Sequence, residues 1–345
     1  MDSWAHLSLY ESTDLVRRLF QQRHGRRLNA EKAREIVSAV AQGREYFSAA
    51  SESGLLVRPL LQYYGVLSLS RALILLLSSN LRETSLPQAH GLSSIAWGAV
   101  LAADTPSALE LRVKVGKGTF LEMLKSTDNS DLSTVFTGPY PDRIIFLRKH
   151  FITGLIDATF TFQEVLSRIS ELRDVYERSL GQCASNYRAF VFTLSAITQT
   201  DIDIFDGRYG LPTEKQIRAE LAIPEGVLLQ RTAQHNFVPP EPHLRYRLLH
   251  PGGNNFNALL PQIENIYDGS TSIVAPFTAG LSVSRIGRYF LLSFFLGMLS
   301  RYHPTSWLAI MQSRQKGDFM LPLIRESMNA IQQHFPTLIM NELEA

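Results

Sequence analysis

The sequence predicts a mainly α-helical protein with an inserted strand-rich α+β region, and a discontinuous helical-bundle core built from both ends of the chain. Two strongly apolar segments far apart in the sequence carry this prediction, residues 58–77 and residues 284–299. Their apolar residues cover nearly the whole circumference of a helix, and such a helix is buried on several sides. Packing the two helices together is the simplest way to bury both.

The same pattern divides the chain of 345 residues into three parts. We expect an N-terminal helical part of the core at residues 1–105, a mixed α+β middle region at 106–280, and a C-terminal helical part of the core at 281–345. A chain of this length exceeds one average domain. The middle region is then an insertion into the helical core or a second layer on it.

Residues 11–50 have a helical pattern. Thr13 or Asp14 can cap a first helix that runs through Phe20, after which the cluster RHGRR breaks it. Asn29 is a favourable N-cap for a second helix at residues 30–42, where apolar residues recur at helical spacing.

Residues 58–77 are expected to form the central helix. Pro59 suits the first turn of a helix, because the N–H that proline lacks would have no helical partner there. This run also comes nearest to a membrane span, but Gln62 and Arg71 interrupt it, and residues 289–299 are too short for one. We therefore expect two buried core helices and no membrane association.

The middle region mixes strand and helix patterns. Residues 109–115 alternate apolar and polar side chains, glycines at 116 and 118 can turn the chain, and residues 119–124 are apolar again, which predicts a hairpin. Residues 162–180 have the spacing of a helix that Gly181 can end. Further strands are expected at residues 190–197, 227–231 and 244–249. Near the C-terminus, Pro336 is expected to separate two helices.

Composition restricts the class of protein. With Lys+Arg 34 against Asp+Glu 32, the net charge of +2 gives no overall attraction to nucleic acid, although a local basic patch stays possible. The single cysteine, Cys183, excludes an internal disulfide and a Cys-rich zinc site. It fits a reducing cytoplasm. The first residues also lack the basic-then-apolar order of a signal peptide, so we expect a cytoplasmic location.

Familiar chemical motifs are weak in this chain. Gly116 to Thr119 resembles part of a phosphate-binding loop, but Leu111 stands where that loop needs glycine, so we expect a plain turn. The nine histidines are scattered, and we predict neither a metal nor a cofactor. Asp201, Asp203 and Asp206 lack the spacing of a calcium loop and are expected in a solvated loop and helix cap.

One catalytic pattern recurs: an arginine followed at short spacing by a histidine, as in HEPN-type ribonucleases. There the arginine positions a phosphate and the histidine transfers a proton. The matching pairs are Arg18 with His24, Arg143 with His150, and Arg245 with His250. A catalytic pair must share one helix. The segment around Arg143 and His150 is the most compatible with a helix, so these two residues are the candidate catalytic pair, although the pattern also arises by chance.

A second group of polar residues lies at the borders of the apolar segments, where a charge must be paired or face a cavity. We predict a shared polar pocket between the two apolar helices. A structural alternative is that Arg301 caps its helix and stacks on Tyr302 or Trp307. The candidate pocket residues are Arg58, Tyr63, Tyr64, His90, Arg301, Tyr302 and Trp307.

Several sequence motifs stand out at the two ends of the chain: GREYFSAA at residues 43–50, RPLLQYYGVLSLSRALIL at 58–75, AHGL at 89–92, LGMLSRYHPTSW at 296–307, and FP at 335–336. In this order they resemble the YaaC-like family of bacterial proteins. The resemblance covers both ends of the chain well and the middle poorly. It implies a cytoplasmic bacterial protein and supplies no catalytic residues. The N-terminal helices also resemble HEPN-type bundles loosely.

Two function hypotheses from different classes follow, and the residues leave open whether the protein is an enzyme. The first is a cytoplasmic interaction or regulatory protein that binds a protein partner, within a multi-protein assembly, through the predicted pocket. The second is a HEPN-like, metal-independent ribonuclease that acts as a toxin or phage-defence effector. Plain nucleic-acid binding is a further possibility that the net charge does not indicate.

Overall fold

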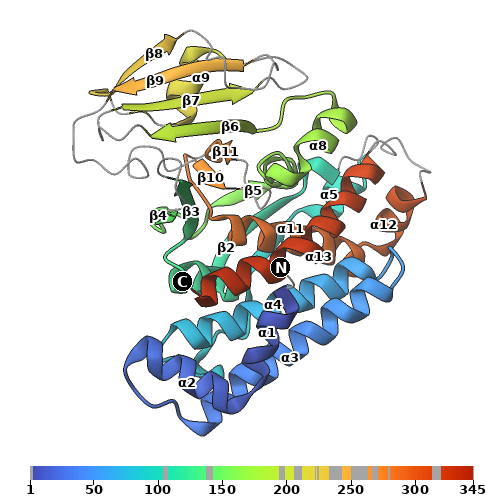
Figure 1. The fold of residues 1–345 in the computed structure, drawn as a ribbon. Coiled ribbons are helices and arrows are strands. Elements are labelled where there is room, and N and C mark those ends of the chain that lie inside the picture. The colour runs from blue at the N-terminus through green and yellow to red at the C-terminus, as the bar shows by residue number, and fades with distance from the viewer. Residues whose placement is uncertain are drawn as a thin grey trace. The chain divides into compact units, whose positions relative to one another are not determined.

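A computed structural model describes the fold (Figure 1). The described residues are 3–103, 108–136, 143–193, 199–205, 212–221, 223, 225–232, 243–249, 263–265, 271–278, 280–312 and 320–344. The chain forms two compact units. Unit 1 consists of Met1–Asn129, Ile152–Leu166 and Val283–Ala345, and unit 2 of Ser130–Phe151 and Ser167–Ser282. The predicted fold class is confirmed, because helices from both chain ends share unit 1 and the strand-rich region is inserted between them.

Unit 1 is mainly helical. Its helices are α1 (Ser3–Leu7), α2 (Thr13–His24), α3 (Ala30–Glu52), α4 (Arg58–Leu77), α5 (Trp97–Leu101), α6 (Thr119–Ser126), α7 (Phe162–Leu166), α11 (Arg285–Tyr302), α12 (Pro304–Met311) and α13 (Met320–Glu344). Asn29 caps α3 as predicted, since its side chain accepts a hydrogen bond from the Glu31 N–H at 2.7 Å. The cap of α2 is Ser12, one residue before Thr13 and two before Asp14, the two predicted caps.

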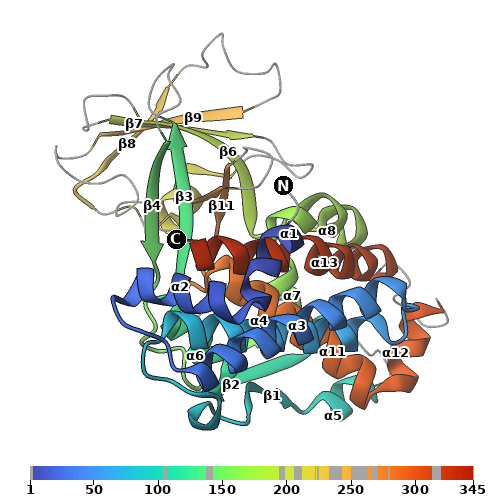
Figure 2. The ribbon, with the colours of Figure 1, turned by 60° about the horizontal axis from the view of Figure 1, so that its bottom comes forward.

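Helix α4 is the centre of unit 1, as predicted from its apolar circumference. It packs against α3, α6, α11 and α13, so the two apolar helices from opposite chain ends do lie together (Figure 2). By length and composition α4 could cross a membrane, but 67% of its most apolar window is buried inside the protein. That burial is what a core helix of a globular protein shows.

Glycine allows the helices around α4 to approach closely. A Cβ atom added to Gly65 of α4 would lie 2.6 Å from the Phe47 ring of α3. A Cβ atom added to Gly297 of α11 would lie 2.6 Å from the Cβ of Tyr63 and 3.3 Å from the Pro59 carbonyl oxygen. The second contact brings the C-terminal part of α11 against the N-terminal part of α4.

The predicted division of the C-terminal helix at Pro336 is wrong. Helix α13 runs without interruption through Pro336, although an internal proline removes a backbone hydrogen bond and costs about 3 kcal/mol. Phe335 and Ile339, which flank the proline, are both fully buried. Their packing in the core offsets the local cost.

A three-stranded antiparallel sheet completes unit 1, with β1 (His90–Ile95), β2 (Arg112–Gly118) and β5 (Thr159–Thr161) in the order β1–β2–β5. The predicted hairpin at residues 109–124 is therefore wrong: β2 leads directly into α6 and pairs with β1 and β5. Gly118 lies against the backbone of Gly91, where a Cβ atom would collide. The alternation of apolar and polar residues along β2 correctly predicted which of its faces is buried, but it did not predict the strands with which β2 pairs.

Unit 2 carries a six-stranded antiparallel sheet in the order β10–β11–β6–β7–β9–β8. Its strands are β6 (Asn186–Thr193), β7 (Gln199–Phe205), β8 (Leu228–Thr232), β9 (His243–Leu249), β10 (Ile263–Asn265) and β11 (Thr271–Val274), and a separate pair is formed by β3 (Ser130–Phe136) and β4 (Arg143–Lys149). The expected strands at 227–231 and 244–249 are confirmed as β8 and β9. Helix α9 (Glu214–Glu220) packs Ile217 on the apolar sheet face with Ile202 and Tyr246.

The helix predicted at residues 162–180 is broken. It consists of α7, a 3-10 turn at Ser170–Leu172, and α8 (Arg173–Leu180), which ends at Gly181 as predicted. At the break, the Ser167 carbonyl oxygen accepts hydrogen bonds from the Ser185 N–H and the Asn186 side chain, both at 2.9 Å. This backbone carbonyl is used by the following strand instead of by a continuous helix.

Candidate functional site

The junction of α4 and α11 brings a buried tyrosine together with a histidine. Tyr63 has no exposed surface, and its ring centroid lies 5.5 Å from that of His90 and 5.6 Å from that of Phe294. His90 is the first residue of β1, and the close contact of Gly91 with Gly118 fixes the start of that strand. The AHGL segment therefore places an imidazole against the core of unit 1.

Arg301, one turn beyond Gly297, extends this group to the surface. Its Nη1 donates a hydrogen bond of 2.7 Å to the Tyr64 hydroxyl. Its guanidinium also lies 4.9 Å from the centroid of the Tyr302 ring, which is 61% exposed. We call Tyr63, Tyr64, His90, Arg301 and Tyr302 the Tyr–Arg cluster. Of the predicted pocket residues, these are the ones that the structure brings together.

Burial sets the protonation of the inner cluster residues. It lowers the pKa of His90, and the positive charge of Arg301 lowers it further. Burial, reinforced by Tyr64, raises the pKa of the Tyr63 hydroxyl, which Arg301 opposes only in part. At neutral pH the inner cluster therefore presents the neutral imidazole of His90 and the protonated phenol of Tyr63 beside the Arg301 guanidinium. Such groups bind and orient other groups, and a protonated phenol is a poor nucleophile.

Arg58 and Trp307 lie near the cluster along the chain. Arg58 is the first residue of α4, and burial lowers its pKa. Trp307 is almost fully buried on α12, which follows α11 directly. Among the described residues, neither the buried Nε of Arg58 nor the indole N–H of Trp307 has a hydrogen-bond partner.

Tyr46 of α3 was not among the predicted site residues. Its ring centroid lies 5.5 Å from that of Tyr64, so it supports the tyrosine that holds Arg301. The sequence did carry a signal, because Tyr46 belongs to the GREYFSAA motif, three residues after Gly43. Helical spacing alone is equally consistent with Tyr46 on the apolar face that carries Phe47 and Ala50.

The candidate catalytic pair has a different environment from the expected one. Arg143 begins strand β4 and His150 directly follows it, so the helix expected there is wrong. His150 Nε2 lies 3.1 Å from Asp131 Oδ2, and their side chains are only 5% and 9% exposed. His24 of another matching pair bonds the Leu76 carbonyl oxygen at 2.8 Å, while Arg18 is exposed on α2. His250, like Asp206, lies outside the described residues.

The aspartates of β7 are not in a solvated loop, which corrects the sequence prediction. Asp203 accepts two hydrogen bonds from Arg245, and Asp201 accepts two of 2.9 Å from Arg247. Burial raises the pKa of Asp201, but the hydrogen bonds from Arg247 and Gln199 outweigh it and bring that pKa below its usual value. These ion pairs join β7 to β9, where the four residues stand directly opposite one another.

The glycine-rich segment before α6 is also used structurally. The segment is the end of a strand followed by the start of a helix, and the expected turn is wrong. The Thr119 N–H and hydroxyl both donate to the Ala89 carbonyl oxygen, at 3.0 and 3.3 Å. The start of α6 is thus tied to β1. In the described part of the chain, no three His, Cys, Asp or Glu side chains are grouped to hold a metal ion.

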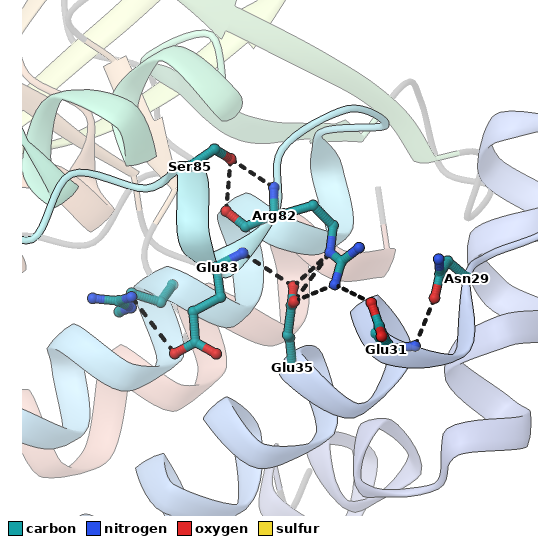
Figure 3. Close-up of polar contacts among 7 residues, drawn as sticks. Asn29, Glu31, Glu35, Arg82, Glu83 and Ser85 are labelled. Atoms are coloured by element: carbon teal, nitrogen blue, oxygen red, sulfur yellow. Dashed lines mark hydrogen bonds and ion pairs between the residues drawn. The ribbon is translucent and has the colours of Figure 1, made fainter.

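The other end of α4 carries a second polar group (Figure 3). Arg82, in the connection after α4, donates to Glu35 at 2.7 Å and to Glu31 at 3.0 Å, and Glu35 also accepts from the Glu83 N–H. The Arg82 hydrogen bonds hold the pKa of Glu35 below its usual range. Each charge in this group has an opposite charge beside it, which indicates a structural role.

Comparison with known families decides the relationship of the chain. The model of the YaaC-like protein family matches residues 8–343. The chain belongs to the YaaC-like protein family. This confirms the resemblance seen in the motifs, and the match extends through the middle region, where the motifs resembled the family poorly. Neither the curated proteins nor the solved structures gave a match. All residues of the Tyr–Arg cluster lie in the part that matches the YaaC-like family.

Proposed function

We propose that this YaaC-like protein is a cytoplasmic bacterial interaction or regulatory protein that works within a multi-protein assembly. Its recognition surface is the Tyr–Arg cluster. The observation that carries the proposal is Arg301, an exposed arginine held by the Tyr64 hydroxyl and stacked on the exposed Tyr302 ring. The few residues that dominate the binding free energy at protein interfaces are enriched in tryptophan, tyrosine and arginine.

The packing beneath the cluster supports this role. Arg301 and Tyr302 end a helix whose preceding residues are buried, and Tyr64 follows the fully buried Tyr63 on α4. Side chains positioned in this way lose less conformational entropy when they bind a partner. A rigid base beneath exposed arginine and tyrosine is the arrangement expected of a binding surface.

The test is co-purification of the tagged protein from its native host, followed by mass spectrometry. We expect a stoichiometric protein partner with the wild type. Arg301→Ala and Tyr302→Ala should weaken binding of that purified partner at least about tenfold, since each removes an exposed aromatic or arginine anchor. The matched control is Arg34→Ala, which removes an exposed arginine from α3 of the same unit.

The proposal fails if no partner is retained. It fails equally if the cluster variants bind the purified partner as well as Arg34→Ala does.

A HEPN-like, metal-independent ribonuclease is the second candidate. The observation in its favour is the pair formed by His150 and Asp131, because a carboxylate that orients an imidazole serves acid–base catalysis. RNA cleavage in the presence of EDTA should then disappear in His150→Ala and survive in His24→Ala. Cleavage that persists in His150→Ala would exclude this pair as the site.

A further inference from the structure

The two arginines at the α4–α11 junction differ from the cations that pair with carboxylates elsewhere in the described residues. Arg44 pairs with Glu11 at 2.7 Å, Lys114 with Asp157 at 2.8 Å, and Arg82 with Glu35 at 2.7 Å. In the described part of the chain, no carboxylate forms an ion pair with Arg58 or Arg301. The positive charge at this junction is therefore left without a negative counterpart.

Arg58 lies at the N-terminus of α4, where the helix dipole is unfavourable for a cation. The N-terminus of a helix carries a partial positive charge, which favours acidic residues in the first turn. The first turn of α4 has no acidic residue and begins with Arg58 itself. A half-buried cation at this position destabilises the isolated protein, and a bound anion would remove that cost.

A buried hydroxyl in the cluster also lacks a hydrogen-bond acceptor. Tyr63 is fully buried, and its hydroxyl oxygen has no hydrogen-bond partner. Its electrostatic neighbours are Tyr64, Arg301 and Tyr302, so it faces the rest of the cluster. An unsatisfied buried hydroxyl costs about 1–3 kcal/mol. Arginine N–H groups and a phenol O–H all donate hydrogen bonds, and what they lack is an acceptor.

Exposed apolar side chains accompany these donors. Leu56 and Val57, immediately before α4, are 49% and 51% exposed, and Tyr302 is 61% exposed. Burying aliphatic side chains against other apolar groups lowers the free energy, because apolar surface is removed from water. The ligand should therefore offer both an oxyanion and apolar side chains.

We infer that the Tyr–Arg cluster, together with Arg58, binds a carboxylate from an acidic segment of a partner protein in which apolar residues flank the acidic ones. This inference rests on the proposed interaction function and names the chemistry of its partner. Arg301 pairs with the carboxylate, and Arg58 at the start of α4 adds positive charge on the side of Leu56 and Val57. Tyr302 stacks on a neighbouring side chain, and Leu56 and Val57 receive the flanking apolar residues. RNA would also supply oxyanions, but it has no aliphatic groups for Leu56 and Val57.

The test uses a fluorescein-labelled synthetic peptide in which Glu and Leu alternate, a matched peptide with Gln in place of Glu, and labelled polyuridylate RNA. Fluorescence anisotropy with the full chain measures binding. We expect the Glu peptide to bind at least about tenfold more tightly than the Gln peptide, with affinity that falls as salt rises. Arg301→Gln and Arg58→Gln should each reduce affinity about tenfold, Arg301→Lys should keep part of it, and Arg34→Gln should keep all of it.

Equal affinity for the Glu and Gln peptides would overturn the inference, as would equal losses in Arg301→Gln and Arg34→Gln. Tighter binding of polyuridylate than of the Glu peptide, with the same dependence on Arg301, would replace the acidic segment with a nucleic acid. If Arg301→Ala loses the host partner but Arg301→Gln keeps it, the charge inference fails while the proposed interaction surface stands. A melting curve for each variant separates loss of binding from loss of folding.

Discussion

The two ends of α4 use their cations in opposite ways. At the C-terminal end, Arg26 and Lys32 donate to the carbonyl oxygens of Ser79 and Ser78. Arg82 is paired there with two glutamates (Figure 3). The N-terminal end holds Arg58 and Arg301 near buried donors that have no acceptor. The positive charges at the C-terminal end are paired within the fold, and Arg58 and Arg301 at the N-terminal end have no carboxylate partner among the described residues.

The helix dipole accounts for the cations at helix C-termini but not for Arg58. The last carbonyl groups of a helix carry a partial negative charge, so cations at the C-terminal end of α4 and Arg301 at the end of α11 are favourable. No such reason applies to Arg58 at an N-terminus. A comparison of variants at the two ends can therefore separate residues that stabilise the fold from residues that bind.

The largest expected effect comes from placing a side chain in the close contact between α4 and α11. Gly297→Leu should lower the free energy of unfolding by about 3 kcal/mol, because the new side chain overlaps Tyr63. The measurement is chemical denaturation. Gly98→Ala is the control, since nothing lies within 4 Å of a Cβ atom added there. A stable Gly297→Leu variant would contradict the close approach that builds the cluster.

The next effect separates the two ends. Glu35→Gln should lower the melting temperature by about 2–4 °C, because it weakens the Arg82 pairing, and should leave partner binding unchanged. Arg301→Gln should do the reverse, with melting within about 1 °C of the wild type because the residue is exposed. If both variants changed melting and binding alike, the proposed division of roles would be wrong.

A smaller effect concerns the pH dependence of stability. Burial lowers the pKa of Lys32 to about 8 in the folded protein, while the unfolded chain keeps the ordinary value of 10.5. Between these two values the unfolded state holds more protons, so stability should rise as pH rises from 8 to 10.5 and be lost as pH falls back through 8. After allowance for solvent screening, the gain is about 1 kcal/mol.

Lys32→Met tests this directly, because it removes the titrating group and keeps an unbranched side chain. Its stability should change less with pH in the same window than that of the wild type. Identical pH profiles, measured by urea denaturation at several pH values, would rule out Lys32 as the source.

The smallest effect is on His90. Arg301→Gln should raise the pKa of His90, because it removes the nearby positive charge, but burial should keep that pKa below its ordinary value. Histidine NMR signals followed through a pH titration measure the change. An unchanged pKa of His90 would show that Arg301 does not act on this side of the cluster.

Much of the candidate site was predictable because its signals are local. Two helices apolar on all sides must be buried, and the polar residues at their borders must have a use, which selected Tyr63, His90 and Arg301. Tyr46 escaped because its spacing marks it equally well as core. The candidate pair of Arg143 and His150 was assigned to a helix because spacing alone does not distinguish a helix from the strand that forms there.

Local sequence patterns were sufficient to predict the two apolar helices, the Asn29 cap, the strands β8 and β9, and the family to which the chain belongs. Tertiary structure alone decided that β2 pairs with β1 and β5, that α13 continues through Pro336, and that Asp203 faces Arg245. Periodicity along a segment fixes which of its faces is apolar. Partners far away in the sequence are chosen by close packing, such as that of Gly118 on Gly91 and of Gly297 on Tyr63, and no local pattern records them.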